Sequence, residues 1–442
     1  MKLEYFEIQN LFNQYDVLLN FKNEVNIFLG ENGMGKTTVL NCIYYVLSGK
    51  LEKLENVLFN SIKLKFDGND EIFVLNKEDL DVYLERNVGL RRRGRSLGNK
   101  NLYNYLRDFD NELINSREDD WEYQNIDNYN ELNFESSRQK LKNVIDFKDR
   151  LEKMVSEEVV YYPTYRRIEE DLSNLGIDFE FERRGFNNRL IQFGMEDVEK
   201  RIYYVLETIR TAAINGFTKM TGILLKQYLN NQNLEMNKEI DKDKLNIALD
   251  RIGNKIEKKD KDNIIEMVSS KEIYKNKYLL NLIVNLISSY EKQNEHDEKI
   301  RKFSKVCNEY LEGKSCRYDE SNVKLDIYRN NNYTHPIDIK HLSSGEKQVL
   351  SVFSKLYLEQ KDKCIILFDE PELSLSMKWQ KHFLPDIMES GKCSMLIAVT
   401  HSPFIFDNDY DNLAQDMGEC IKEKGQEKND EYRRSEEGKN MC

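Results

Sequence analysis

Apolar and polar side chains alternate at the start of the chain. Within residues 1–29, Val17, Leu19 and Phe21 occupy every second position, which is typical of strands that bury one face. We therefore expect a hairpin that leads into a further strand at residues 25–29.

A second alternating pair covers residues 61–66 and 71–75. The sequence Asp67-Gly-Asn-Asp lies between the two segments and is a strong turn signal. These segments predict an antiparallel edge beside a larger sheet.

Continuous apolar runs predict buried strands later in the chain. They cover residues 158–162, 364–369 and 395–400, and such runs are typical of parallel strands that are covered on both faces. Residues 322–330 alternate again and predict one more strand. The last predicted element ends near Tyr410.

Helical periodicity dominates the middle of the chain, where Val198, Ile202 and Val205 recur on one face. Charged breaks divide this tract into several helices. Strands before and after helices predict an α/β fold with a mixed sheet and a helical insertion domain. The expected organisation is an N-terminal lobe at 1–195 with a polar helical insert at about 90–155, a helical domain at 196–318, a C-terminal lobe at 319–417, and a disordered charged tail at 418–442.

Composition narrows the class of protein. The 442 residues are 40% hydrophobic and 33% charged, with a net charge of −12, which fits a soluble protein and argues against wholesale wrapping of nucleic acid. No apolar run approaches the ~20 residues that span a bilayer, and the N-terminus enters a strand pattern at once. The seven cysteines are scattered without a Cys-x-x-Cys pair, so we expect reduced thiols and a cytoplasmic protein.

The sequence Gly30-Glu-Asn-Gly-Met-Gly-Lys-Thr-Thr38 follows the strand at 25–29 and fits the P-loop pattern Gly-x4-Gly-Lys-Ser/Thr in full. Glycines let backbone N–H groups approach phosphate oxygens, and the following helix presents its positive end to them. Lys36 is expected to reach the β- and γ-phosphates, and Thr37 to bind Mg²⁺. The predicted nucleotide contacts are Gly30, Glu31, Asn32, Gly33, Met34, Gly35, Lys36, Thr37 and Thr38.

Two later strands end in residues that complete such a site. Asp369 and Glu370 end one apolar run; in a P-loop fold Asp369 belongs to the Mg²⁺ shell, and Glu370 can polarise the water that attacks the γ-phosphate. His401 ends the next apolar run and can hydrogen-bond the γ-phosphate. We predict Glu370 and His401 as catalytic residues, and Thr37 and Asp369 as metal ligands.

Two basic segments leave alternatives open. Residues 90–95 contain four arginines, and Arg166 and Arg167 follow the strand at 158–162. Each segment is either a contact to phosphates or an acidic partner, or a solvated loop with local salt bridges.

Residues 341–348 read His-Leu-Ser-Ser-Gly-Glu-Lys-Gln and open a helix expected at 349–359. Ser-Ser-Gly at a helix start is both an N-cap and an anion-binding terminus. Pro371-Glu-Leu-Ser-Leu-Ser376 follows the Asp-Glu pair.

The order P-loop, Ser-Ser-Gly-Glu helix, Asp-Glu strand and His strand resembles the ATP-binding cassette superfamily, in its soluble SMC and RecF branch. The resemblance implies ATP and Mg²⁺ as cofactors and a homo-oligomer in which Ser343 caps the γ-phosphate of ATP bound to another protomer's Lys36. The family signature is Leu-Ser-Gly-Gly-Gln; Leu342, Ser343 and Gly345 match it, while Ser344 and Glu346 replace Gly and Gln. The implied contacts are Ser343, Ser344, Gly345, Glu346 and, as the Q-loop residue, Gln192, with Arg166 as the alternative; residues 371–376 match the D-loop.

Residues 161–169 and 400–406, together with the motifs above, look more narrowly like the ATPase subunits of the bacterial anti-phage systems PARIS and Septu. That resemblance implies a dimer of heads or a hexamer that senses a phage-encoded trigger and controls a separate effector nuclease of the Toprim or HNH type. The residues after His401 are too few for a fused Toprim domain, and no HNH metal set is visible, so we expect the nuclease on another chain. The alternative is a RecF- or SMC-like ATPase in DNA repair, with DNA as its partner; a transporter motor is a weaker third hypothesis.

Overall fold

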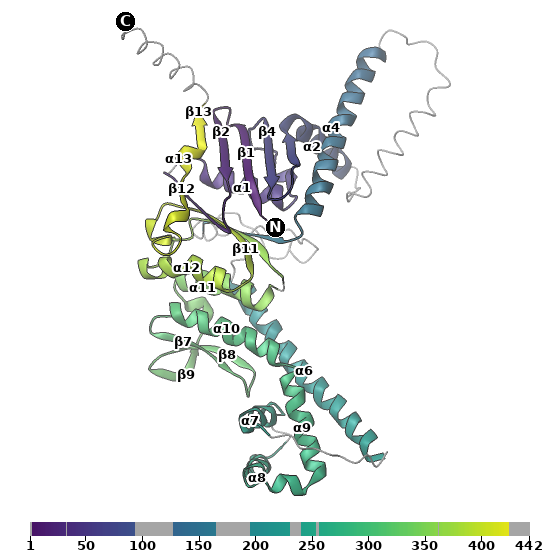
Figure 1. The fold of residues 1–442 in the computed structure, drawn as a ribbon, viewed down its shortest axis with the longest axis vertical. Coiled ribbons are helices and arrows are strands. Elements are labelled where there is room, and N and C mark those ends of the chain that lie inside the picture. Colours follow the sequence, from purple (N-terminus) through teal and green to yellow (C-terminus); the bar gives the residue numbers. More distant parts are fainter. Residues whose placement is uncertain are drawn as a thin grey trace, which may run out of the picture. The chain divides into compact units, whose positions relative to one another are not determined.

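The structure is a computed structural model that describes residues 2–31, 33–92, 127–164, 195–229, 240–252, 256–360 and 362–423. The chain divides into two compact units (Figure 1). Unit 1 comprises Met1–Thr164, Asp362–Glu372 and Cys393–Cys442, and unit 2 comprises Tyr165–Lys361 and Leu373–Lys392. Each is described by itself.

A five-stranded parallel sheet forms the centre of unit 1. Its order is β12-β3-β11-β10-β6. Both β10 and the last six residues of β11 are fully buried, as continuous apolar runs predict. The strands are β3 (Val25–Leu29), β6 (Glu158–Tyr162), β10 (Cys364–Asp369), β11 (Cys393–Thr400) and β12 (Ala414–Asp416).

The register of the central strands brings their carboxyl ends together. Asp369 of β10 pairs with Val399 of β11, and Thr400 pairs with Leu29 of β3. Ligand sites in parallel α/β sheets lie just beyond this edge.

The antiparallel strands form a second sheet of unit 1, in the order β13-β2-β1-β4-β5. The expected antiparallel edge of the nucleotide sheet is therefore a sheet of its own, while the predicted α/β class is confirmed. Gly68 makes the β4–β5 turn with φ +74°. The strands are β1 (Leu3–Leu11), β2 (Tyr15–Asn20), β4 (Ser61–Phe66), β5 (Ile72–Asn76) and β13 (Ile421–Glu423).

Helices of unit 1 include α4 (Asp127–Met154), which lies within the expected polar insert and packs against α2 (Lys77–Arg92), which begins before it. In this pair Asn143 donates to Asp79 at 3.0 Å and Lys140 pairs with Glu78 at 2.9 Å. The helical elements are α1 (Lys36–Leu47), η1 (Leu51–Leu54), α2 (Lys77–Arg92), α4 (Asp127–Met154), η8 (Pro403–Ile405), η9 (Asp411–Leu413) and α13 (Met417–Cys420).

The prediction that the last element ends near Tyr410 is wrong, because η9, β12, α13 and β13 follow it. Residues 418–423 of the expected tail complete α13 and form β13, and the rest of the tail lies outside the described residues.

Unit 2 contains the predicted run of helices. Leu245, Leu280 and Ile283 belong to one apolar cluster to which several of these helices contribute. The apolar faces of the amphipathic helices are buried against one another in this cluster. The elements are α6 (Met195–Leu229), α7 (Lys242–Arg251), α8 (Lys258–Ser269), η5 (Glu272–Lys275), α9 (Lys277–Glu291) and α10 (Asn294–Tyr310). No helix in the described part of the chain is long and apolar enough to cross a membrane.

A three-stranded antiparallel sheet and two further helices complete unit 2. Tyr310, Phe353 and Phe383 form an aromatic cluster with ring centroids 5.7–6.4 Å apart. The elements are β7 (Lys314–Asp319), β8 (Lys324–Arg329), β9 (Asn332–Ile337), η6 (Ile339–His341), α11 (Ser344–Ser354), η7 (Lys355–Glu359) and α12 (Met377–Glu389). The helix expected at 349–359 therefore begins at Ser344, directly after its N-cap.

Candidate functional site: a nucleotide cradle and a capped signature helix

The P-loop turns between β3 and α1 through two left-handed glycines. Gly33 has φ +89° and Gly35 has φ +75°, a region that side-chain-bearing residues rarely adopt. A Cβ on Gly33 would meet no atom within 4 Å, so this part of the loop is open on its outer side. No side chain among the described residues caps the first turn of α1, so its N–H groups are left for a phosphate.

Lys36 is the first residue of α1 and is largely buried. Its ammonium donates to the carbonyl oxygens of Gly30 and Glu31, both at 2.9 Å, and it contacts Nε2 of His401. Burial lowers the pKa of Lys36, and the carboxylates of Glu370 and its acidic neighbours oppose this effect. Phosphate oxygens are stronger acceptors than these carbonyls because they carry charge, so the cradle fits a nucleoside triphosphate.

Asp369 ends β10 with a carboxylate in a residue only 2% exposed. Its Oδ2 accepts hydrogen bonds from the hydroxyls of Thr37 and Thr164, each at 2.9 Å. Its Oδ1 is buried and has no hydrogen-bond partner among the described residues. A carboxylate with one unsatisfied oxygen beside a threonine hydroxyl fits Mg²⁺, which prefers hard oxygen ligands.

Glu370 leaves the strand in a strained conformation. Its φ is +51°, which costs a residue with a side chain about 1–3 kcal/mol and is found at functional sites. Its backbone N–H donates to the carbonyl of Val399 at 2.8 Å, which holds the turn in place. Its carboxylate Oε1 lies 3.6 Å from Nε2 of His401.

The electrostatics of Glu370 suit a general base. Burial raises the pKa of its carboxyl, the carboxylates of Asp369 and Glu372 raise it further, and His401 and Lys36 oppose the shift. A carboxylate with a raised pKa is a stronger proton acceptor.

His401 is fixed by a residue outside the predicted catalytic set. Its backbone N–H donates to Oε1 of Glu372 at 2.8 Å, and Glu372 is buried. Lys36 at the start of α1, Glu370 after β10 and His401 after β11 therefore form one contact chain.

The signature residues lie in unit 2 and form a capping box at the start of α11. Ser343 accepts from the N–H of Glu346 at 3.4 Å, while its own N–H and hydroxyl donate to Oε2 of Glu346, both at 2.9 Å. Lys314 of β7 donates to both oxygens of the same carboxylate at 2.6 and 2.7 Å. Glu346, which departs from the signature pattern, thus organises the end of the helix.

Gly345 marks a close approach between α11 and residues 371–376. A Cβ at this position would lie 2.2 Å from the carbonyl oxygen of Ser374, which itself has φ +68°. The signature helix is therefore in direct contact with Ser374, which belongs to the part of the D-loop segment that lies in unit 2.

The structure thus brings most of the predicted residues together in two groups. In unit 1 the P-loop residues lie with Asp369, Glu370 and His401, and in unit 2 Ser343–Glu346 share one helix start. Asn32, Gln192, Arg166 and the arginines at 93–95 lie outside the described residues.

Three supporting residues were missed at the level of sequence: Thr164, Glu372 and Lys314. Thr164 follows a strand neighbouring β10, so the rule that carboxyl ends of parallel strands share one edge could have placed it beside Asp369. Lys314 contacts residues 32 positions away, and no local pattern indicates this.

The arrangement in unit 1 is that of a P-loop nucleotide hydrolase. Lys36 and the α1 N-terminus would bind phosphate oxygens, and Thr37 and Asp369 would hold Mg²⁺, which neutralises charge on the phosphates. Glu370 would accept the proton of the attacking water. His401, which contacts Lys36, would donate a hydrogen bond to the γ-phosphate.

Comparison with known proteins narrows this class. The AAA ATPase domain family matches residues 1–406. The chain belongs to this family and is an ATP-binding protein of the ATPase type.

Short segments resemble the DNA replication and repair protein RecF. That of Lactococcus lactis subsp. cremoris is 44% identical over 46 residues, which are 10% of this chain and 13% of the relative. That of Clostridioides difficile is 29% identical over 114 residues, 23% of this chain and 30% of the relative. The chain spans less than a third of the length of these relatives.

Two solved structures show a distant likeness over nearly the whole chain. One is the Smc head domain with an extended coiled coil bound to the C-terminal domain of ScpA, from Pyrococcus furiosus, with 14% identity, a TM-score of 0.36, and coverage of 98% of this chain and 99% of that chain. The other is the Smc head domain with a coiled coil and joint from Pyrococcus yayanosii, with 13% identity, a TM-score of 0.33, and coverage of 92% and 93%.

Proposed function

We propose that this chain is an ATP-hydrolysing switch subunit of an anti-phage system, which assembles through shared ATP sites and controls a separate effector nuclease. ATP hydrolysis would use Glu370 as the base, and ATP binding would set the switch. The proposed partners are further copies of the chain, the effector nuclease and a phage-encoded trigger, and the proposed location is the cytoplasm.

One observation carries the switch proposal, namely the contact chain Lys36–His401–Glu370. Lys36, which would bind phosphate, contacts His401, which would sense it. His401 in turn lies beside Glu370, the proposed base. An arriving γ-phosphate competes for the ammonium of Lys36, so it must rearrange all three side chains together. This contact chain would couple binding to catalysis.

The second part of the proposal is that Ser343 meets ATP bound to another copy. In the structure its one hydroxyl proton donates to the buried carboxylate of Glu346, so binding ATP would require this proton to turn from Glu346 to a phosphate oxygen. The N-terminus of α11, with its positive end and backbone N–H groups, favours a phosphate at that place. The anti-phage role is supported by the sequence resemblance of residues 161–169 and 400–406 to PARIS and Septu ATPase subunits.

Mixing two inactive variants tests the shared site. Lys36→Ala removes the cradle cation and Ser343→Arg blocks the signature, so each variant alone should lose turnover. In a one-to-one mixture half of the dimers are mixed, and each has one of two sites intact, so about one quarter of the parent turnover should return. Ser270→Arg, at an exposed serine of the same unit, is the control and should stay active.

A mixture that stays inactive, while each variant remains folded, rejects the shared site. The effector is tested separately by co-purification with the product of the neighbouring gene. Full protection against phage by the ATPase alone would reject the two-component scheme.

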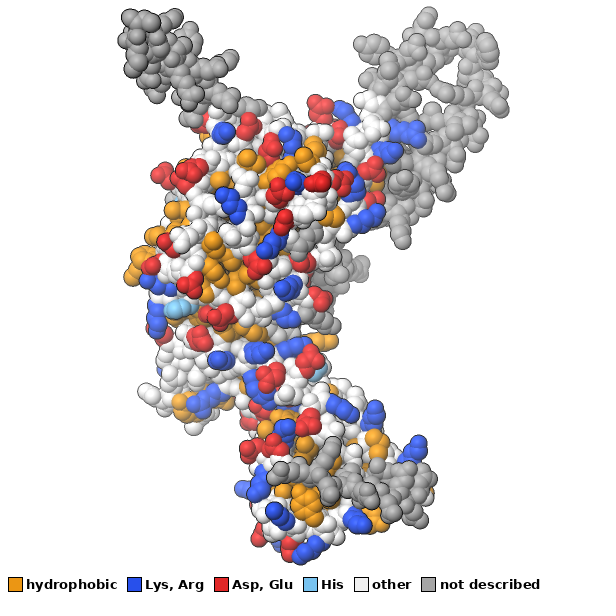
Figure 2. Space-filling view, viewed as in Figure 1, with side chains coloured by type: hydrophobic (Ala, Val, Ile, Leu, Met, Phe, Trp, Pro, Cys, Tyr) orange, Lys and Arg blue, Asp and Glu red, His pale blue; other side chains and the backbone are white. Residues whose placement is uncertain are grey.

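A second candidate is a RecF-like ATPase that acts on DNA, which the RecF segments favour. On the face shown in Figure 2, basic and acidic side chains are interspersed. DNA-stimulated turnover that falls steeply with salt would favour this candidate, and an unchanged rate would count against it.

A further inference from the structure

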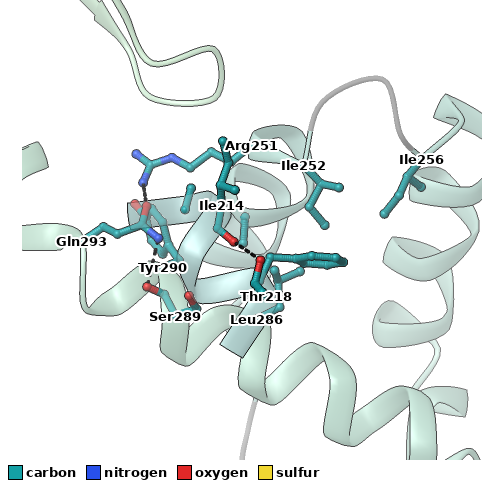
Figure 3. A pocket seen from close by; sticks show the side chains of 12 residues that line it. Ile214, Thr218, Arg251, Ile252, Ile256, Leu286, Ser289, Tyr290 and Gln293 are labelled. Atoms are coloured by element: carbon teal, nitrogen blue, oxygen red, sulfur yellow. Dashed lines mark hydrogen bonds between the residues drawn. The ribbon is translucent and has the colours of Figure 1, made fainter. Parts of the chain in front are cut away.

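A cavity of about 270 Å³ lies in unit 2, among α6, α7 and α9 (Figure 3), and it opens to solvent, because its lining residues Ile214 and Phe217 are 66% and 43% exposed. None of its lining residues belongs to the nucleotide cradle or to the signature helix. The cavity is larger than the ~150 Å³ apolar cavity that binds benzene in a well-studied case. It has room for a substituted aromatic ring.

Beside the cavity, α6 and α9 approach each other closely at a glycine. A Cβ on Gly216 of α6 would lie 2.0 Å from Oγ of Ser289 of α9. The helices thus touch at this point, and larger side chains such as Phe217 and Leu286 line the space beside the crossing.

One end of the cavity is polar, as Figure 3 shows for Arg251, Ser289, Tyr290 and Gln293. Arg251 donates to Gln293 Oε1 at 2.9 Å and lies 4.8 Å from the centre of the Tyr290 ring. Gln293 uses one amide N–H on the carbonyl of Ser289 at 3.2 Å, and its amide group carries two. The Ser289 hydroxyl makes no hydrogen bond to any residue that the structure describes.

The charges at this end are already paired. The guanidinium of Arg251, with a side chain only 4% exposed, bonds the buried carboxylate of Asp297 at 2.6 Å. Glu320, which accepts from Tyr290 at 3.1 Å, is neutralised by Arg301 at 2.6 Å. A charged ligand would lose its hydration here without gaining a free counter-charge, so the cavity disfavours ions.

The other walls are apolar. Ile252, Ile256, Phe217 and Leu286 supply hydrocarbon surface, and Figure 3 shows Ile252 and Ile256 on the side away from Gln293. Ligand sites commonly combine such walls with a few convergent polar groups.

We propose that this cavity binds a small uncharged molecule that joins an aromatic or short hydrocarbon body to one carbonyl or amide group. The body lies between Phe217, Ile252 and Leu286, and the carbonyl oxygen accepts from Ser289 and Gln293. The site goes beyond the proposed ATPase switch and does not depend on it.

Three probes of equal ring size test the chemistry, namely benzamide, benzoate and toluene. Each is titrated into the full chain and binding is followed by saturation-transfer NMR of the probe. Benzamide should bind with a Kd on the order of 1 mM. Benzoate should bind at least about tenfold more weakly because its charge is unpaired, and toluene several-fold more weakly because it lacks the carbonyl.

Two neighbouring alanines provide a matched pair of variants. Ala213 lines the cavity and Ala212 does not, so Ala213→Phe should fill the space and abolish benzamide binding, while Ala212→Phe should leave it unchanged. Ser289→Ala removes only a hydroxyl and should weaken benzamide about threefold or more while leaving toluene unchanged.

Absence of saturable benzamide binding at about 10 mM overturns the proposal, given the ligand efficiency expected for such a probe. Benzoate binding as tightly as benzamide, or equal effects of the two alanine variants, overturns it as well. If Ala213→Phe does not fold, the Ser289→Ala comparison decides. Because the readout is probe binding, a failed ATPase test leaves this result interpretable.

Discussion

Thr164 should set the metal affinity of the nucleotide site through Asp369. Its hydroxyl shares Oδ2 of Asp369 with the hydroxyl of Thr37. When Thr37 turns to Mg²⁺, Thr164 is left to orient the carboxylate. Thr164→Val keeps the shape of the side chain and removes this donor.

The magnitude follows from the geometry. A 2.9 Å hydrogen bond to a carboxylate that is almost fully buried contributes about 1.5–3 kcal/mol, and each ~1.4 kcal/mol is a factor of ten. Residues that orient a metal ligand typically change metal affinity by about 10–100-fold. We expect about tenfold, at the lower end, because Asp369 itself still binds the metal.

The assay is the free Mg²⁺ concentration that gives half-maximal ATP turnover at saturating ATP. It should rise about tenfold in Thr164→Val, whereas Thr164→Ser, which keeps the hydroxyl, should match the parent. Equal Mg²⁺ dependence of Thr164→Val and parent would refute the reasoning. A serine variant as impaired as the valine variant would instead point to packing.

Four further predictions concern the other supporting and catalytic groups. Glu372→Ala removes the acceptor that fixes the end of β11 and should lower kcat about tenfold with little change in KM, whereas Glu372→Gln keeps an acceptor oxygen and should recover most of kcat. Glu370→Gln should retain ATP and lower turnover about 10²–10⁴-fold. In the parent, only deprotonated Glu370 can accept a proton, and its pKa is raised; turnover should therefore be present above that pKa and be lost on acidification at a higher pH than for an ordinary glutamate, which a pH–rate profile measures. Lys314→Met leaves Glu346 buried without its cation and should destabilise unit 2 by about 2 kcal/mol. This is less than the ~3–5 kcal/mol of a fully buried pair because the Lys314 side chain is 25% exposed. Adding Glu346→Gln should restore most of this stability, which urea unfolding followed by the fluorescence of Trp379 in a Trp121→Phe background measures.

Strands with a strong side-chain pattern could be predicted from the sequence, and short ones could not. β10 and β11 are continuous apolar runs and lie where the pattern places them. β12 and β13 have three residues each, and they are held by backbone pairing to β3 and β2. Backbone pairing leaves no mark on side-chain periodicity, so these strands were missed.

The sequence pattern also could not predict which strands lie next to each other in a sheet. Alternation in β1, β4 and β5 reports that one face is buried, but it does not report which strand lies alongside. The antiparallel strands therefore form their own sheet, although the pattern suggested an edge of the parallel one. The observed start of α11 at Ser344 differs from the expected start at Val349 for another reason. The capping box fixes the start of the helix, while the apolar periodicity begins only at Val349.

The supporting residues hold the reacting groups of the site in position but do not react themselves. Thr164, Glu372 and Lys314 each make hydrogen bonds to a charged motif residue or use a carboxylate to hold one, and such bonds are about twice as strong as neutral ones. Motif variants such as Lys36→Ala remove a reacting or binding group, so they should abolish function at any Mg²⁺ or ATP concentration. Variants of the supporting residues leave every reacting group present, so they should have partial effects. The Thr164 variant should shift the Mg²⁺ midpoint, the Lys314 variant should shift the urea midpoint, and the Glu372 variant should lower kcat without abolishing it. A supporting variant that abolished turnover even at saturating Mg²⁺ and ATP, while still folded, would place that residue among the groups that touch the nucleotide.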